Sequence, residues 1–390
     1  MILAFQNEFG GQYEGGANWL EVTLRSLGML PDPPMCLVVN TSSETLPESL
    51  RQSAHVQAVQ FNSSENSLTK RLTQSLLCRI KPKPWEQPGL TRLAANYKID
   101  LWVSFDWFHG LAPHRPMLIC YPDFQFRELA ELFSSEDIRA REERWEKITK
   151  HAQGIFAISQ ATAADAVKLH PQISKKLYVC GFPPLFQEAD LRLNPVEIRR
   201  RFSLPQRFFL VCNQFWEHKN HLLVLHALFR LKQQGMTPPV VAFTGRPYDS
   251  RRPNAFSDLL RFVQEHDLHM YCRFFGVLPR DEQLALIRSA EAVIQPSRFE
   301  GRGAITEETS LLGTQLLCSN LPVHRELDLV DAIFFGVDDY ERLAELLQRS
   351  YPRTTSEPAE LVKESERRAR AYGQRLMEII EDVRGKSAEG

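Results

Sequence analysis

The stretch at residues 294–326 reads IQPSRFEGRGAITEETSLLGTQLLCSNLPVHRE, and it decides the fold. An apolar strand pattern ends near Gln295, a loop with two glycines follows, and a helical pattern then covers about residues 304–312. A glycine directly after that pattern is a typical helix end. A glycine loop lets backbone N–H groups approach an anion, and a helix start favours negative charge. The stretch therefore predicts a phosphate site at this turn.

Strand and helix signals alternate along the rest of the chain. Apolar runs predict buried strands at residues 2–5, 35–39, 101–105, 117–121, 154–158, 208–212, 240–244, 273–275, 292–295 and 314–318. Amphipathic stretches predict helices at residues 19–27, 221–232, 255–266, 281–290 and 364–383. Such alternation indicates parallel sheets with right-handed crossovers. A proline-containing break between about Cys180 and Leu204 is interpreted as a linker between two halves of similar size.

Two carboxylates flank the glycine turn. Glu300 precedes the predicted helix, and Glu308 lies about one turn inside it, facing the same crevice. Carboxylates repel phosphates, so this pair is better suited to accept hydrogen bonds from hydroxyls of a sugar and a ribose. The alternative is a pair of solvated acids that complement the helix dipole. Arg302 adds a fixed positive charge to the same loop.

Two further loops follow predicted strands. Residues 213–221, NQFWEHKNH, place Lys219 where ligands bind in open α/β sheets, although a lone lysine there is usually an ordinary surface residue. Residues 10–18, GGQYEGGAN, come after the first strand and before the first predicted helix. Their glycines include Gly15 and Gly16 and allow the backbone to pass close to a ligand.

Composition narrows the possible classes. The chain has 390 residues and is 43% hydrophobic, which suffices for two domains. A net charge of -1 argues against a dedicated nucleic-acid binder. Seven scattered cysteines without a CxxC pair favour buried thiols in a reducing compartment over a zinc site. No apolar run approaches the roughly 20 residues of a membrane span, and no signal peptide is recognised, so we expect a cytoplasmic protein.

One segment suggests contact with a membrane surface. Residues 70–85, KRLTQSLLCRIKPKPW, would place apolar residues on one helical face with basic residues beside it and Trp85 at the end. This pattern predicts possible association with the inner face of the cell membrane. The alternative is an ordinary surface helix packed on the first sheet.

The motifs resemble those of the retaining glycosyltransferases of family 4, which have the GT-B fold. Residues 213–221 resemble the lysine-bearing donor loop of that family. Residues 275–282, FGVLPRDE, followed by PSRFEG at 296–301, are a specific match, and Glu300 with Glu308 fits the E-x7-E motif. Residues 121–125, YPDFQ, and 157–159, AIS, are also similar to members of the family. The resemblance is strong over about residues 211–326 and patchy over the first half.

The resemblance implies an α/β chain with two Rossmann-like, doubly wound domains facing a central cleft. Residues 1–190 would form the acceptor domain and residues 200–363 the donor domain, with a terminal helix at about 364–390 crossing back to the first. The implied activity is sugar transfer from a nucleotide-sugar donor to a saccharide or lipid-linked acceptor with retention of configuration. UDP is favoured over GDP as the donor nucleotide, and no metal or other cofactor is expected.

The resemblance also implies residue roles. Glu308 would bind the ribose, Glu300 the donor sugar and Lys219 the diphosphate. Asp123 and His109 are candidates to position the acceptor, with ordinary polar or capping roles as alternatives. The remaining donor-binding candidates are Gly15, Gly16, Asn213, Phe275, Gly276, Gly301, Arg302, Gly303 and Ala304.

The sequence departs from the family pattern at two positions. Asn213 stands where many members have an arginine, so charge neutralisation would rest on Lys219, helped by Arg302. Phe126 stands where related sequences often have a histidine after Asp-Phe-Gln.

Other functions stay open at this point. A catalytically silent sugar-nucleotide-binding protein would keep the same motifs. A nicotinamide-dependent dehydrogenase would need a GxGxxG near the first strand and an acid about 20 residues further on, and that glycine fingerprint is absent there. A sugar-nucleotide epimerase is an alternative within the same fold.

Overall fold

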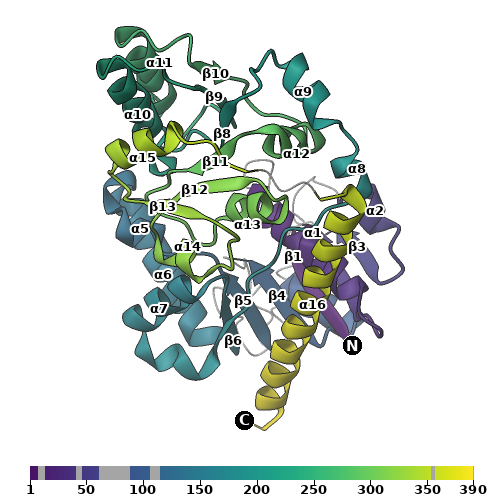
Figure 1. Cartoon of the computed structure of the whole chain (residues 1–390). Helices are drawn as coiled ribbons and strands as arrows, with labels where there is room; N and C mark the ends of the chain where they lie inside the picture. The colour runs from purple at the N-terminus through teal and green to yellow at the C-terminus, as the bar shows by residue number, and fades with distance from the viewer. Residues whose placement is uncertain (8–13, 41–45, 61–87, 106–114, 353–355, 390) are drawn as a thin grey trace.

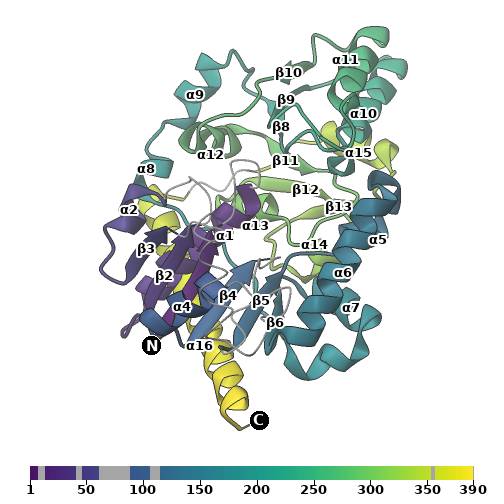
Figure 2. The ribbon, with the colours of Figure 1, turned by 180° about the vertical axis from the view of Figure 1, so that it is seen from behind.

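The computed structural model describes residues 1–7, 14–40, 46–60, 88–105, 115–352 and 356–389. Two parallel β-sheets lie one above the other, each covered on both faces by helices (Figures 1 and 2). In the described residues the first sheet has the order β3-β2-β1-β4-β5-β6-β7, and the second has the order β10-β9-β8-β11-β12-β13. The prediction of two doubly wound α/β domains is confirmed.

The strands of the first sheet are short and largely buried at its centre. They are β1 (Ile2–Asn7), β2 (Met35–Asn40), β3 (Val56–Gln60), β4 (Leu101–Phe105), β5 (Met117–Tyr121), β6 (Gly154–Ala157) and β7 (Leu177–Val179). The second sheet consists of β8 (Phe208–Cys212), β9 (Val240–Thr244), β10 (Cys272–Phe274), β11 (Ala292–Gln295), β12 (Gln315–Ser319) and β13 (Ile333–Phe335). Strands covered on both faces read as continuous apolar runs, which is why most were predicted.

Three strands were missed, and all three lie at sheet edges. β3 and β7 flank the first sheet and β13 ends the second. Only one of the five residues of β3 is buried, and the three residues of β7 are half-buried. An edge strand that is only partly covered has no continuous apolar run, so its sequence carries a weaker signal.

Helices cover both faces of each sheet. In the first half they are α1 (Glu14–Gly28), α2 (Glu48–Arg51), α4 (Pro88–Asn96), α5 (Gln125–Glu128), α6 (Ser135–His151) and α7 (Gln160–Leu169). In the second half they are α8 (Glu188–Leu191), α9 (Pro195–Arg201), α10 (His221–Gln233), α11 (Ala255–Glu265), α12 (Arg280–Ser289), α13 (Ala304–Leu311), α14 (Pro322–Glu326), α15 (Tyr340–Leu347) and α16 (Pro358–Glu389). Short 3-10 turns are η2 (Ala130–Leu132), η3 (Pro171–Lys176) and η4 (Glu217–Lys219).

The prediction that Gly15 and Gly16 belong to a loop is wrong. Both lie in the first turn of α1, which begins at Glu14, while residues 10–13 of the predicted glycine loop lie outside the described residues. Glycine is a poor helix former, but the apolar face of α1 is fully covered, with Trp19 and Leu24 at 0% exposure. Packing of that face against the first sheet outweighs the local preference of two glycines.

The break predicted as a linker is partly structured. α8 and α9 fall within residues 180–204. Phe186, Leu191, Ile198 and Leu204 are buried in the core on one face of the second sheet. The chain therefore contributes to the core of the second sheet well before β8 begins. These apolar residues pack on that sheet, and the local sequence does not reveal this contact.

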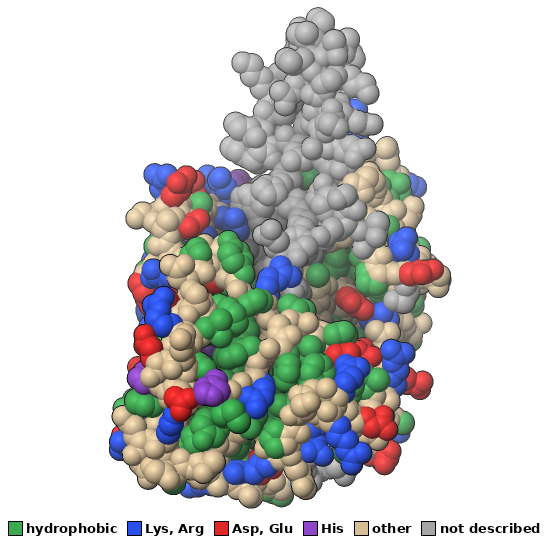
Figure 3. All heavy atoms as spheres, turned by 90° about the horizontal axis from the view of Figure 1, so that it is seen from above, with side chains coloured by type: hydrophobic (Ala, Val, Ile, Leu, Met, Phe, Trp, Pro, Cys, Tyr) green, Lys and Arg blue, Asp and Glu red, His purple; other side chains and the backbone are tan. Residues whose placement is uncertain are grey.

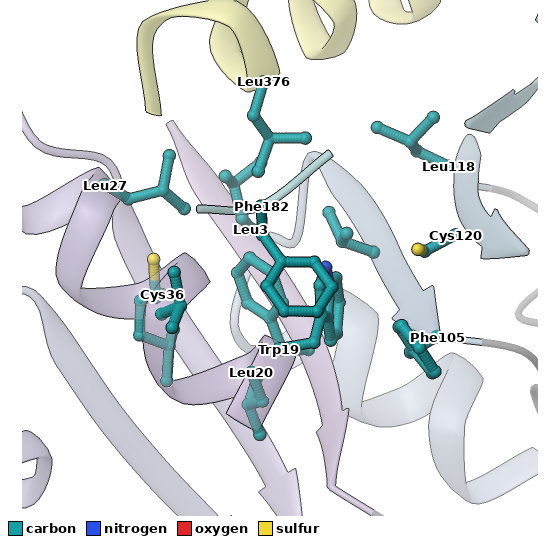
Figure 4. Close-up of a cluster of buried hydrophobic side chains, with 14 of the residues drawn as sticks. Leu3, Trp19, Leu20, Leu27, Cys36, Phe105, Leu118, Cys120, Phe182 and Leu376 are labelled. Carbon is teal, nitrogen blue, oxygen red and sulfur yellow. The ribbon is translucent and has the colours of Figure 1, made fainter. Parts of the chain in front are cut away.

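The terminal helix α16 links the two halves. Leu361 near its start packs in a core of the second sheet, whereas Leu376 and Ile380 pack in a core of the first sheet. Figure 1 shows the course of α16, and Figure 4 shows Leu376 in the core of the first sheet. It lies close to α1: a Cβ at Gly373 would come within 2.6 Å of the carbonyl oxygen of Ser26. Thr23 and Tyr372 also share a buried hydrogen bond of 2.9 Å. Glycine at 373 thus permits the helix contact that anchors the chain end on the first domain.

Candidate active site

Two loops meet at the carboxyl ends of neighbouring strands in the second sheet. β8 leads into η4 and then α10, and β11 leads through residues 296–303 into α13. Because β8 and β11 pair directly, their following loops are adjacent. Asn220, in the left-handed region at φ 58°, connects them by donating to the carbonyl oxygen of Pro296 over 3.1 Å.

The loop contact brings Lys219 and Glu300 together. Lys219 Nζ lies 2.6 Å from Glu300 Oε1, and the Glu300 side chain is only 9% exposed. The same oxygen accepts hydrogen bonds from Gln295 Nε2 at 2.6 Å and Ser297 Oγ at 2.7 Å. Burial tends to raise the pKa of Glu300, but the charge of Lys219 and these hydrogen bonds hold it below its ordinary value. Glu300 is therefore a preorganised carboxylate at neutral pH.

Asn213 extends this network without adding charge. Its Nδ2 donates to Gln295 Oε1 over 2.8 Å, and Gln295 in turn donates to Glu300. The position that carries an arginine in many family 4 sequences thus supplies a neutral, buried amide here. The sequence pattern indicates no role for Gln295 or Ser297, because their side-chain directions depend on how the loop folds.

Gly301 and Gly303 shape the start of α13. Gly303 is the residue before the helix, has φ 85° and leaves the helix without a side-chain cap. A Cβ at Gly301 would come within 2.6 Å of the carbonyl oxygen of Pro122 in the first domain. Glycine is therefore needed at 301 for close approach and at 303 for backbone conformation. Ala304 begins the helix, whose first N–H groups have no intrahelical acceptor.

The close approach at Gly301 brings Asp123 to the site from the first domain. Its Cβ lies 3.1 Å and its Oδ2 3.3 Å from the position of a Cβ on Gly301. Asp123 Oδ1 also accepts a hydrogen bond from the backbone N–H of Gln125 at 2.9 Å, so the alternative capping interaction is present too. His109 lies outside the described residues.

Glu308 is held by an arginine that sequence reasoning left without a role. Glu308 Oε1 lies 2.6 Å from a guanidinium nitrogen of Arg280, the first residue of α12. Gly276, in the loop before α12, has φ 68° and no atom within 4 Å of the position of an added Cβ. Phe275 beside it packs edge-on against Phe202 at 4.8 Å. The loop before α12 therefore has an open backbone turn at Gly276, and Arg280 at its end holds the Glu308 carboxylate.

Arg302 lies at the boundary of the two domains. Its guanidinium donates to the carbonyl oxygens of Ile158 at 2.7 Å and Phe182 at 3.1 Å, and pairs with Glu307 at 2.8 Å. A Cβ at Gly181 would lie 1.6 Å from Arg302 Nη1, so glycine leaves room for this side chain. For Arg302 to add charge to a diphosphate, as expected from the sequence, it would have to leave these acceptors.

A second contact across the domain boundary involves Glu326 of α14. Its two carboxylate oxygens accept hydrogen bonds from the backbone N–H groups of Gln160 at 2.8 Å and Ala161 at 2.9 Å, in the first turn of α7. Ser159 caps the same helix by accepting from Thr162 N at 3.0 Å. A carboxylate of one domain therefore completes the cap of a helix in the other.

We expect Glu326→Ala to loosen the contact between the domains. Loss of a helix cap typically costs about 1 kcal/mol, so the equilibrium ratio of domains in contact to domains apart should fall several-fold. Small-angle X-ray scattering of the ligand-free protein should show a larger radius of gyration. Glu345→Ala is a suitable control because Glu345 is exposed and pairs with Arg342 in its own helix. Equal radii of gyration for Glu326→Ala and Glu345→Ala would contradict the role of Glu326 in holding the two domains together.

Three buried histidines lie near Lys219. His218, His221 and His324 are at most 3% exposed, and burial lowers the pKa of each, that of His221 to about 3. The unfolded chain takes up protons on histidine near pH 6.5, whereas the folded chain does not. Stability is thus highest above that pH and falls as the pH drops from 6.5 toward the folded pKa.

For His221 we predict a loss of about 1.4 kcal/mol of unfolding free energy per pH unit below 6.5. His221→Phe, which keeps the stacking with Phe215, should reduce the slope of stability against pH by that amount. Urea unfolding at pH 6.5, 5.5 and 4.5 measures the slope. Identical slopes in the two proteins would show that His221 does not stay neutral in the fold.

Comparison with known proteins identifies a matching family model and a shared fold. The model of the family described as glycosyl transferases group 1 matches residues 197–366, which include the Lys219 and Glu300 loops. No curated protein matches the sequence.

Several solved structures share the whole architecture. Anabaena Alr3699/HepE in complex with UDP-glucose aligns over 100% of both chains, with a TM-score of 0.64 and 15% identity. A glycosyltransferase from Rickettsia africae ESF-5 aligns over 98% of both chains, with a TM-score of 0.63 and 15% identity. WaaG, a glycosyltransferase involved in lipopolysaccharide biosynthesis, covers 96% of this chain and 95% of its own, with a TM-score of 0.61 and 13% identity. The chain has the GT-B glycosyltransferase fold.

Proposed function

We propose that this protein is a retaining glycosyltransferase that moves a sugar from a nucleotide-sugar donor, with UDP favoured over GDP, to a saccharide or lipid-linked acceptor. One observation carries the proposal: Lys219, Glu300 and the uncapped start of α13 converge where the loops after β8 and β11 meet. The match of residues 197–366 to glycosyl transferases group 1 supports it. The UDP-glucose complex of HepE supports the choice of nucleotide.

The proposed division of labour follows from charge. Lys219 and the helix dipole of α13 suit a diphosphate, whereas Glu300 and Glu308 suit hydroxyl donors. Glu300 would hold the donor sugar and Glu308 the ribose, with Arg280 keeping the Glu308 carboxylate in place. The backbone turn at Phe275 and Gly276 would meet the base. Asp123, close to Gly301 across the domain boundary, would face the acceptor.

In the proposed reaction the bond between the anomeric carbon and the diphosphate oxygen breaks. The acceptor oxygen bonds to the same face of that carbon, and the leaving phosphate oxygen takes the acceptor proton. Stabilising charge on the leaving group is the largest contribution expected from the protein. Lys219 and backbone dipoles supply it in this proposal, so no metal or other cofactor is required.

A panel of UDP-, GDP- and ADP-sugars, with and without saccharide acceptors, tests the proposal. Nucleotide diphosphate release that depends on the acceptor and persists in excess EDTA is expected, and NMR of the product should show retained anomeric configuration. Complete loss with EDTA that magnesium reverses would contradict the metal-free mechanism. Binding without any release would favour the catalytically silent alternative, for which the neutral amide of Asn213 is the main argument.

The cellular setting is also a proposal. We propose a cytoplasmic enzyme of polysaccharide biosynthesis that contacts the inner face of the membrane through residues 70–85, which lie outside the described residues. Among the helices that the structure describes, none is long and apolar enough to cross a bilayer. Seen from the end of the second domain, apolar side chains lie in several groups among charged ones (Figure 3). Salt-sensitive cosedimentation with anionic vesicles that weakens in Lys81→Glu/Lys83→Glu would support membrane contact.

A further inference from the structure

His324 is fully buried beside the start of α13, and the function proposed above gives it no role. It lies in α14, two residues before Glu326, and has 0% exposure. The position of an added Cβ on Gly303 is 3.2 Å from His324 Nε2, so the ring edge adjoins the loop that precedes α13. Glu300 and Lys219 are close enough to act on the charge of the ring.

The hydrogen bonds of His324 define its tautomer. Nδ1 lies 2.8 Å from the carbonyl oxygen of Ser319, and a carbonyl can only accept, so Nδ1 carries the proton. Burial lowers the pKa of His324, which keeps the ring neutral at physiological pH. Nε2 therefore presents a lone pair and needs a donor.

None of the described residues donates a hydrogen bond to Nε2. His324 Nε2 is buried and has no hydrogen-bond partner there. A buried acceptor without a partner costs free energy, so such atoms in folded proteins usually serve a ligand or a bound water. The nearby hydroxyl of Thr306 donates to the carbonyl oxygen of Gly303 instead.

We infer that His324 binds the nucleotide-sugar substrate: its Nε2 accepts a hydrogen bond from a hydroxyl of the transferred sugar. The inference rests on the proposed function and deepens it, because it requires a donor with a hydroxyl that reaches Nε2 past Gly303. Gly303 has no side chain to stand between the ring edge and the sugar. Glu300 and His324 then form two acceptors for the sugar, beside the cationic Lys219 that faces the diphosphate.

His324→Asn is the test variant, since an asparagine amide can still donate to the Ser319 carbonyl while removing the acceptor at Nε2. Calorimetry compares UDP with UDP-glucose, or with whichever nucleotide sugar the wild-type protein turns over. We expect the sugar nucleotide to bind about ten-fold more weakly to the variant and UDP to bind equally to both. His269→Asn, at an exposed histidine, is the matched control and should change neither affinity.

Deoxy-sugar donors provide a second measurement on the wild-type chain, in case the variant folds poorly. Removing the hydroxyl that His324 binds should cost about ten-fold in the wild type and nothing further in His324→Asn. Equal weakening of UDP and the sugar nucleotide in the variant, or no sensitive hydroxyl in the wild type, overturns the role of His324. Failure of the wild type to bind any nucleotide sugar overturns the proposed function itself and this inference with it.

Discussion

Lys219→Ala is expected to lower turnover by about 10²–10³-fold, the usual effect of removing one preorganised group that stabilises developing negative charge. The reason is electrostatic: Lys219 pairs with Glu300 where the two loops meet, and Asn213 offers only an amide. Binding of uridine should change little, whereas binding of UDP should weaken, because the lysine acts on the diphosphate. Equal losses for uridine and UDP would show that Lys219 acts elsewhere.

The same substitution leaves Glu300 buried without its ionic partner. Removing one member of a buried pair typically costs about 3–5 kcal/mol of stability. The double variant Lys219→Ala/Glu300→Gln removes both charges, so it should regain melting temperature without regaining turnover. Lys232→Ala is the matched control, because Lys232 pairs with the exposed Asp267, which is not a residue of the candidate site. Recovery of turnover in the double variant would mean that the loss was one of folding.

Glu308→Ala is expected to weaken UDP binding by about ten- to a hundred-fold, since a hydrogen bond to a charged group contributes roughly 1.5–3 kcal/mol. If Glu308 holds the ribose, 2'-deoxy-UDP should bind more weakly than UDP to the wild type and equally to the variant. Calorimetry with both nucleotides makes the comparison.

Arg280 provides the control for this second experiment. Arg280→Ala leaves the Glu308 carboxylate in place but removes the guanidinium 2.6 Å from it. We expect a smaller loss of UDP affinity than in Glu308→Ala and a preserved preference for UDP over 2'-deoxy-UDP. Unchanged nucleotide affinity in a folded Glu308→Ala protein would remove Glu308 from the ribose site.

Much of the fold could be predicted because the central strands have a recognisable local sequence pattern. The bounds of β4, β5, β8, β9 and β11 agree with the predicted ranges, since strands buried on both faces are unbroken apolar runs. The strand–loop–helix turn around Gly301 was likewise predicted from glycines and a helical period. Edge strands β3, β7 and β13 were not, because a partly covered strand needs no such run.

The candidate site divides in the same way. The sequence alone determined which residue types follow which strands, and so placed Lys219, Glu300 and Glu308 at the carboxyl edge of the second sheet. Only the tertiary structure decided their partners: β8 lies beside β11, which joins Lys219 to Glu300 across 81 positions of sequence. It also placed Arg302 against the first domain and His324 beside Gly303. Local periodicity sets where an element lies, whereas side-chain pairing depends on strand order and on the close approach of the two domains, which no local pattern encodes.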